Sequence, residues 1–145
     1  MSLSIEGEGL LRQSLSLLHS CGREHNECVV VWLARASRPE RVTRVVHPIH
    51  TSHHGGYQID SQWLDHLWRE LARRGERIAA QAHTHPGRAF HSRTDDRFPI
   101  AWQPGLYSLV IPDFARQPSQ EQEWYLTQLD PDGRWNTQNW LEITR

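Results

Sequence analysis

The sequence contains no lysine, and all 16 of its basic residues are arginine. Against 17 acidic residues they leave a formal net charge of −1, so the chain lacks the positive surface that nucleic-acid binding needs. Its longest apolar run, CVVVWLA at 28–34, is far too short to span a bilayer. The first residues, MSLSIEGEGLL, carry acids where a signal peptide carries positive charge. We therefore expect a cytoplasmic protein that binds neither nucleic acid nor membrane.

Cysteine is also scarce, since only Cys21 and Cys28 are present and they do not form a Cys-x-x-Cys pair. Reduced thiols are therefore expected. A chain of 145 residues with 37% hydrophobic residues suits one globular domain, here 1–145. Most of the seven tryptophans are expected in the core.

The pattern of apolar residues predicts an α/β fold. Leucines at helical spacing predict a helix over 8–20. A stripe of tryptophan and leucine from Trp63 to Leu71 predicts a second helix, capped by Asp60 or Ser61 and ended by Gly75. Apolar or alternating runs predict strands, the first two forming a hairpin and the last two joined by a turn at Asp132-Gly133. The expected strands are 27–35, 41–48, 77–85, 106–114, 123–129 and 134–143. They would form one mixed or antiparallel sheet flanked by two main helices, with 50–57 as a loop.

The strand at 77–85 ends in His-x-His. Because side chains alternate along a strand, His83 and His85 point to the same face, with Gln81 and Ala79 below them, and Ile78 faces the other side. Two imidazoles on one face can bind one zinc ion, and a further ligand would come from the segment after Pro86-Gly87. Candidate residues there are Ser92, Asp95 and Asp96.

His-x-His alone is a weak signal in a chain with ten histidines. The second histidine-rich stretch, HPIHTSHH at 47–54, is interpreted as loop decoration, with adventitious metal binding as the alternative. The metal hypothesis depends on the combination of strand, His-x-His, proline and Ser-x-x-Asp. Metallo-β-lactamase sites, which follow the second histidine with x-Asp-His, and cupins, which need a later glutamate, fit worse.

The stretch HTHP…SRTD resembles the JAB/MPN+ (JAMM) metalloprotease motif, His-Ser/Thr-His-Pro followed by Ser-x-x-Asp. That family also has a glutamate at the start of the first buried strand, a position that Glu27 occupies here. The predicted order of elements matches across essentially the whole chain. The resemblance implies a JAB/MPN-like domain that binds one zinc per chain through His83, His85 and an aspartate, with water in the open fourth position.

The aspartate is ambiguous, because the family usually has ten residues between the second histidine and the aspartate. That spacing selects Asp96 but places Arg93 at the serine position. Keeping Ser-x-x-Asp selects Asp95 with Ser92 and shortens the loop by one residue. Asp95 is preferred, since the loop absorbs a deletion more easily than the serine turn does, and Asp96 is the fallback.

The resemblance also assigns the catalytic roles. Glu27 would accept a proton from the zinc-bound water and pass it to the leaving amine, while zinc and Ser92 would stabilise the oxyanion. The implied substrate is the C-terminal tail of a ubiquitin-like protein or its conjugate, with E1-like and E2-like proteins in the same pathway. Phe98 and Trp102 are candidates for a substrate groove, with core packing as the alternative.

Three readings of the function follow. The first is an isopeptidase that removes the ubiquitin-like protein from targets. The second is a processing peptidase for a ubiquitin-like or sulfur-carrier precursor, and the third is a non-catalytic MPN-type scaffold. The missing lysines leave only the N-terminal amine open to conjugation, which reflects either self-protection or a genome that favours arginine codons.

Overall fold

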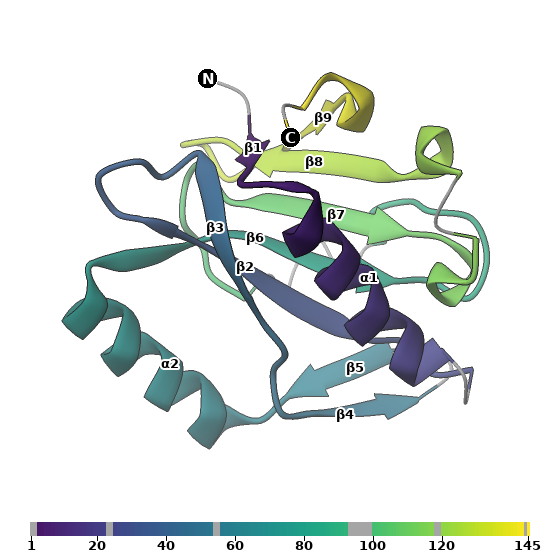
Figure 1. Ribbon diagram of the computed structural model, residues 1–145, viewed down its shortest axis with the longest axis horizontal. Helices are drawn as coiled ribbons and strands as arrows, with labels where there is room; N and C mark the ends of the chain where they lie inside the picture. The colour runs from purple at the N-terminus through teal and green to yellow at the C-terminus, as the bar shows by residue number, and fades with distance from the viewer. Residues whose placement is uncertain (1–2, 23–24, 54–55, 93–99, 118–119, 144) are drawn as a thin grey trace.

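The computed structural model describes residues 3–22, 25–53, 56–92, 100–117, 120–143 and 145. Within these residues the strands form a seven-stranded mixed sheet, in the order β1-β3-β2-β6-β7-β8-β9, and a separate two-stranded sheet, β4-β5 (Figure 1). The β1–β3 and β6–β7 pairs are parallel and the other pairs antiparallel. The predicted α/β class, with a mixed sheet and two main helices, is confirmed.

The two helices and nine strands of the described residues follow one another as α and β elements, with three short 3₁₀ turns near the C-terminus. In chain order they are β1 (Ser4–Ile5), α1 (Glu8–Gly22), β2 (Val29–Arg35), β3 (Arg41–Val46), β4 (His50–His53), β5 (Gly56–Ile59), α2 (Ser61–Arg74), β6 (Glu76–Thr84), β7 (Tyr107–Ile111), η1 (Asp113–Ala115), η2 (Glu121–Glu123), β8 (Tyr125–Leu129), β9 (Trp135–Gln138) and η3 (Trp140–Glu142).

The helices cover opposite faces of the sheet. Val30 and Trp32 of β2 lie in one apolar cluster with the leucines of α1, whereas Val31 and Leu33 lie in a second cluster with Leu67 and its neighbours on α2. This division follows from the alternation of side chains along a strand. In Figure 1, α1 crosses in front of the central strands, and α2 lies away from it at the lower left. The central strands β2 and β6 are thus covered on both faces.

The ends of α2 follow the predicted signals. The Asp60 carboxylate accepts a hydrogen bond of 2.9 Å from the backbone N–H of Trp63, which satisfies one free donor of the first turn. Gly75 ends the helix in the left-handed conformation at φ 65°, where a side chain would be strained. These two signals position the helix directly before β6, the strand that carries the histidines.

Three predictions about strands are wrong. The segment predicted as a strand at 134–143 is a strand only from Trp135 to Gln138, and η3 follows it. The segment predicted as a loop at 50–57 falls in the β4-β5 hairpin. The backbone of His50–His53 pairs with that of Gly56–Ile59, although the polar side chains there follow no strand pattern. The strict alternation in β6 also fails at its start, where Ile78 lies with α2 and Ala79 with α1. A register shift opposite Trp32 and Leu33 reverses the faces there.

The prediction of reduced thiols is also wrong for this structure. Cys21, in the last turn of α1, and Cys28, directly before β2, are joined by a disulfide. Their Cα atoms lie 5.6 Å apart, because the short connection folds the end of α1 back against the start of β2. That separation suits a disulfide, and the sequence spacing of the cysteines did not indicate it.

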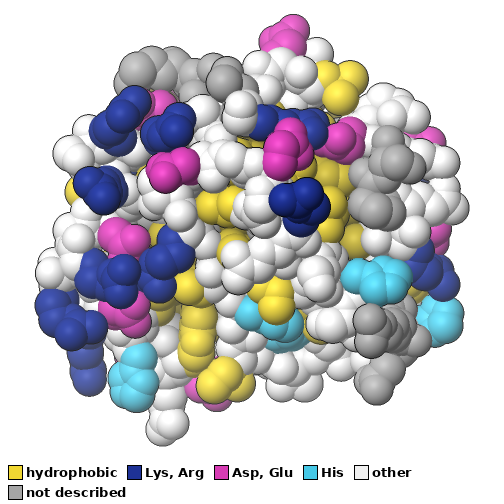
Figure 2. Space-filling view, viewed as in Figure 1, with side chains coloured by type: hydrophobic (Ala, Val, Ile, Leu, Met, Phe, Trp, Pro, Cys, Tyr) yellow, Lys and Arg dark blue, Asp and Glu magenta, His cyan; other side chains and the backbone are white. Residues whose placement is uncertain are grey.

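Charged side chains of both signs are interspersed on the surface. Figure 2 shows basic and acidic groups side by side on the face viewed. Arg44, for example, binds both Glu70 and Glu76, and Arg74 binds the same two carboxylates. Among the described residues, no helix has the length and apolar character to cross a membrane.

A buried hydrogen-bond pair joins α1 to the sheet and gives a prediction for stability. The Ser14 hydroxyl accepts from the Trp32 indole N–H at 2.9 Å and donates to the Leu10 carbonyl. Ser14→Ala should leave the indole N–H without a partner and lower the unfolding free energy by about 1–3 kcal/mol. The control is Ser20→Ala, since the exposed Ser20 hydroxyl also bonds a helix carbonyl. Equal urea midpoints for the two variants would contradict the assignment.

Candidate active site

Two histidines lie together at the end of the central strand β6. His83 is fully buried and His85, directly after the strand, is 6% exposed. Their ring centroids lie 5.2 Å apart. The two rings therefore occupy neighbouring positions on one face of the sheet, as the alternation of the strand predicts.

Glu27 lies beside them through the pairing of β2 with β6. The antiparallel register pairs Val29 with His83. It continues past the strand end, where Thr84 donates its N–H to the carbonyl of Cys28 at 3.1 Å and its hydroxyl accepts from the Cys28 N–H at 2.9 Å. The next step of this register sets Glu27 opposite His85, and residues directly opposite in an antiparallel pair share a face. Glu27 is 7% exposed, so a buried acidic residue lies opposite the second histidine in this register.

The turn after β7 holds the backbone around His85 in place. The His85 N–H donates to Ile111, and its carbonyl accepts from Phe114 at 2.9 Å. Asp113 donates to the carbonyl of Gly87. The η1 turn has positive φ at all three of its residues, including 52° at the buried Phe114, which is costly for residues other than glycine. Such strain is typical of backbone that a site holds in a required position.

The loop after the histidines is anchored at His91 and at Ile100 to the face of the sheet that carries the histidines. Near its start, His91 Nε2 lies 3.1 Å from the Ser108 hydroxyl, which also accepts from the Gln81 amide. At its end, the Ile100 N–H donates to Gln81 Oε1 at 2.8 Å. Because Gln81 lies two residues before His83 on the strand, both ends of the loop are anchored beside the histidine face. Sequence reasoning placed Gln81 on this face but did not recognise this anchoring role.

Of the predicted metal ligands and catalytic residues of the loop, the structure describes Ser92 and leaves the others outside its described residues. Ser92 is half-buried and follows directly after the anchored His91. Asp95 and Asp96 lie outside the described residues, as does Phe98. The choice between the two aspartates therefore stays a prediction.

Aromatic side chains surround the histidines. The ring centroids of Tyr57, on β5, and His83 lie 5.5 Å apart. Phe90 packs edge-on against His85, with 4.7 Å between the ring centroids. Phe90 is 43% exposed. Trp102 is 59% exposed, so the alternative that Trp102 packs in the core is wrong. Of the seven tryptophans, only Trp32, Trp124 and Trp140 are buried in the core. Tyr57 was missed because it lies on the unpredicted hairpin.

The donor set at this position fits a zinc ion. The two imidazoles of His83 and His85, with ring centroids 5.2 Å apart, would supply two nitrogen ligands. A catalytic zinc site has three protein ligands and one open position. The third protein ligand would come from the loop that returns at Ile100, the segment that contains both aspartates.

Comparison with known proteins finds a matching family model and a similar curated protein. The chain matches the family model for prokaryotic homologs of the JAB domain over residues 13–127. A probable metalloprotease from Sinorhizobium fredii is 33% identical over 133 residues, which cover 88% of this chain and 82% of that protein.

Solved structures share the fold at low sequence identity. A solution structure of a protein from Desulfitobacterium hafniense superimposes with a TM-score of 0.67 at 18% identity, covering 97% of this chain and 90% of that one. A crystal structure of a JAB1/MPN domain protein from Archaeoglobus fulgidus gives 0.56 at 15% identity, covering 99% and 98%. At these identities the likeness concerns the fold alone.

Proposed function

The chain belongs to the family of prokaryotic JAB-domain proteins, and from this we propose that it is a zinc-dependent peptidase or isopeptidase. Its substrate would be the bond that follows the C-terminal tail of a ubiquitin-like protein. What supports the proposal most is that the rings of His83 and His85 lie together at the end of β6, and that the pairing of β2 with β6, continued past Val29, brings Glu27 level with His85. A metal-binding pair beside an acid–base group is what metal-assisted hydrolysis requires.

The metal ligands in this proposal are His83, His85 and an aspartate of the returning loop, Asp95 or, as the fallback, Asp96. A zinc ion bound there supplies Lewis acidity, which lowers the pKa of water to about 7. The protein fixes the two imidazoles by burial and by the backbone bonds of His85 to Ile111 and Phe114. This rigid backbone reduces the reorganisation that ligand binding would otherwise need.

Glu27 acts as general base and then general acid. Its carboxylate takes a proton from the attacking water and gives it to the nitrogen of the leaving amine when the C–N bond breaks. It directly precedes Cys28, which is tied to Thr84 by one backbone hydrogen bond and by one bond to the Thr84 hydroxyl, and this anchored backbone would hold Glu27 beside His85. The Ser92 hydroxyl donates a hydrogen bond to the oxygen of the carbonyl under attack, a role whose loss typically costs about a hundredfold to a thousandfold in rate.

The surface beside the histidines suits an extended peptide with an apolar residue. Phe90 packs edge-on against His85 and leaves 43% of its surface exposed. The Arg88 guanidinium lies over the same ring, 5.5 Å from its centroid. A flexible tail that passes His85 would meet the Phe90 ring and the Arg88 guanidinium. The ring suits an apolar side chain of the tail, and the guanidinium suits the carbonyl oxygens of its backbone.

The experiment that tests this function compares two substrates with the same ubiquitin-like tail, one linked to a lysine amine and one to a linear C-terminal extension. Mass spectrometry measures release of the tail. Cleavage of the lysine-linked substrate supports an isopeptidase, and cleavage of the linear fusion alone supports a processing peptidase. Zinc-loaded, folded protein that cleaves neither substrate while binding the tail would support a non-catalytic scaffold and contradict the proposal.

The third ligand gives a separate prediction. Asp95→Asn should lower zinc affinity by more than about a hundredfold, because the amide loses the charge that binds the ion, whereas Asp96→Asn should keep the zinc. The two adjacent carboxamide variants serve as matched controls for each other. Zinc content after dialysis against a chelator is the measurement, and the reverse pattern would assign the ligand to Asp96.

A further inference from the structure

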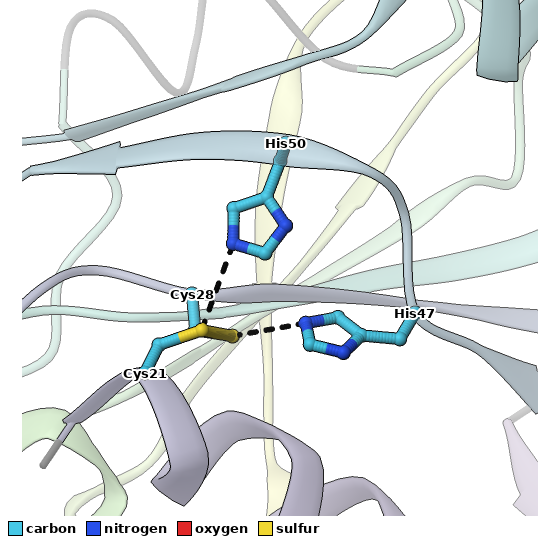
Figure 3. A group of neighbouring side chains, drawn as sticks. All are labelled: Cys21, Cys28, His47 and His50. Carbon is cyan, nitrogen blue, oxygen red and sulfur yellow. Dashed lines mark hydrogen bonds between the residues drawn. A yellow bond between two sulfur atoms is a disulfide. The ribbon is translucent and has the colours of Figure 1, made fainter.

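A second group of metal-binding side chains lies outside the proposed active site. Cys21 comes from the end of α1, Cys28 from the start of β2, and His47 and His50 from the connection between β3 and β4 (Figure 3). One ligand atom from each residue lies within 4.8 Å of the other three. The proposed peptidase mechanism uses none of these four residues.

Each histidine directs a ring nitrogen at a sulfur. Cys28 Sγ lies 3.3 Å from His47 Nε2, and Cys21 Sγ lies 3.6 Å from His50 Nε2 (Figure 3). Around a tetrahedral zinc with bonds of about 2.3 Å to sulfur and about 2.0–2.1 Å to nitrogen, neighbouring ligand atoms lie about 3.3–3.8 Å apart. A sulfur–nitrogen edge of such a tetrahedron is about 3.6 Å long, so the Cys21–His50 distance matches it and the Cys28–His47 distance of 3.3 Å is slightly shorter.

The hydrogen bond on the far side of the His50 ring identifies the nitrogen that is free to bind. His50 Nδ1 lies 2.8 Å from the carbonyl oxygen of Pro48. A carbonyl only accepts, so Nδ1 carries the proton and donates it, and in a neutral ring Nε2 then presents a lone pair. This arrangement is the usual outer hydrogen bond of a histidine that binds a metal through its other nitrogen.

A disulfide alone does not account for that lone pair. A sulfur in a disulfide carries no proton, so His50 Nε2 faces an atom that has nothing to donate to it. A cation shared by the four side chains would bond to this nitrogen and to the equivalent nitrogen of His47. Two sulfurs and two imidazole nitrogens in a closed set of four are the ligands of a structural zinc site.

We propose that Cys21, Cys28, His47 and His50 bind a structural zinc ion when the two cysteines are reduced. This inference goes beyond the proposed function and does not depend on it. The disulfide and the zinc site are alternative states of the same two sulfurs. On reduction the sulfurs separate toward the distance of about 3.8 Å that tetrahedral zinc requires.

The location of this site links it to the catalytic groups. Glu27 directly precedes Cys28, and His50 begins the hairpin whose Tyr57 packs on the His83 ring. A zinc ion bound here would join the end of α1, the start of β2 and the β3–β4 connection at one point. It would thereby fix the backbone that positions the proposed base and the aromatic cover of one proposed ligand.

The test uses cobalt in place of zinc, because thiolate ligands give cobalt a strong near-ultraviolet charge-transfer band that imidazole and carboxylate ligands do not give. The protein is first reduced with a water-soluble phosphine. The phosphorus takes an oxygen from water and becomes a phosphine oxide, and the two sulfurs receive two electrons and two protons. The resulting thiols release both protons when the metal binds.

The variant His83→Ala/His85→Ala isolates this site from the proposed catalytic one. We expect the reduced variant to bind one cobalt ion per chain with the charge-transfer band and intense visible bands of tetrahedral geometry, and zinc to displace it. Cys21→Ser or Cys28→Ser should weaken the band and lower zinc affinity more than about a hundredfold. His50→Ala should shift the visible bands, while His66→Ala, on the exposed face of α2, should leave the spectrum unchanged.

The reduced parent protein provides a second measurement if the double variant does not fold. Its charge-transfer band reports only this cluster, since these are the two cysteines of the chain. Reduced protein with both thiols accessible to a thiol reagent but with no charge-transfer band would overturn the proposal and leave a structural disulfide. If the protein shows the charge-transfer band but cleaves no substrate, the result contradicts the proposed peptidase function and supports the second zinc site.

Discussion

Replacing His83 or His85 by alanine should abolish hydrolysis and remove the zinc that the active site binds. The two imidazoles lie together at the end of β6, and the loss of either leaves one imidazole nitrogen and one loop carboxylate, too few ligands for a stable catalytic site. The rate should fall by more than the hundredfold to ten-thousandfold that losing a general base costs (about 10²–10⁴). Zinc content and turnover are measured on the same preparations.

The matched control for these variants is His66→Ala, because His66 is exposed on α2. His83 is fully buried between β2 and β7, so circular dichroism must confirm that the His83 variant folds. His85 lies outside the strand and its replacement should disturb the fold less. Full turnover in a folded His85→Ala protein would contradict the assignment of the metal ligands.

Glu27→Gln should lose turnover while it keeps both the fold and the zinc. The amide has the shape of the carboxylate, and the two hydrogen bonds between Cys28 and Thr84, one of them to the Thr84 hydroxyl, involve no side-chain atom of Glu27. A glutamine cannot accept and return a proton, so the rate should fall about 10²–10⁴-fold.

The measurement combines single-turnover cleavage with metal analysis. Glu24, three residues before Glu27 in the sequence, is the other glutamate close to the start of the buried run, so Glu24→Gln is the matched control and should cleave at the parental rate. If Glu27→Gln lost its zinc, Glu27 would be a ligand and the general base would have to be sought elsewhere.

Local signals predicted the elements that hold the active site. Asp60 and Gly75 set the ends of α2, and the apolar run before Arg35 gave the buried strand β2. Alternation in β6 placed His83 and His85 on one face because that part of the strand pairs regularly. Each of these features depends on residues that are close together in the sequence, and patterns in a single sequence report such local relationships.

The features that were missed depend on distant contacts. The β4-β5 hairpin forms through backbone pairing among polar residues, and the Cys21–His50 and Cys28–His47 contacts join positions 29 and 19 residues apart. Neither the cysteine spacing nor the histidine-rich stretch shows this proximity by itself. The histidines that were interpreted as loop decoration, His47 and His50, therefore gained a chemical role only when the fold placed them beside two sulfurs.

The register shift in β6 has the same origin. Ile78 and Ala79 occupy faces opposite to those expected, because β2 and β6 change register opposite Trp32 and Leu33. A bulge depends on the partner strand as much as on the strand itself. The shift ends before Ala80, so it leaves the histidine end of the strand in the predicted alternation.

The most direct test of the central claim is a zinc titration of the metal-free protein with an isopeptide-linked conjugate of a ubiquitin-like tail as substrate. Mass spectrometry follows release of the free tail carboxylate and the free lysine amine. We expect no cleavage without metal, and a rate that rises with zinc until the site at His83 and His85 is filled. Cleavage at an equal rate by the metal-free protein, or an intact conjugate after full zinc loading, would contradict the account.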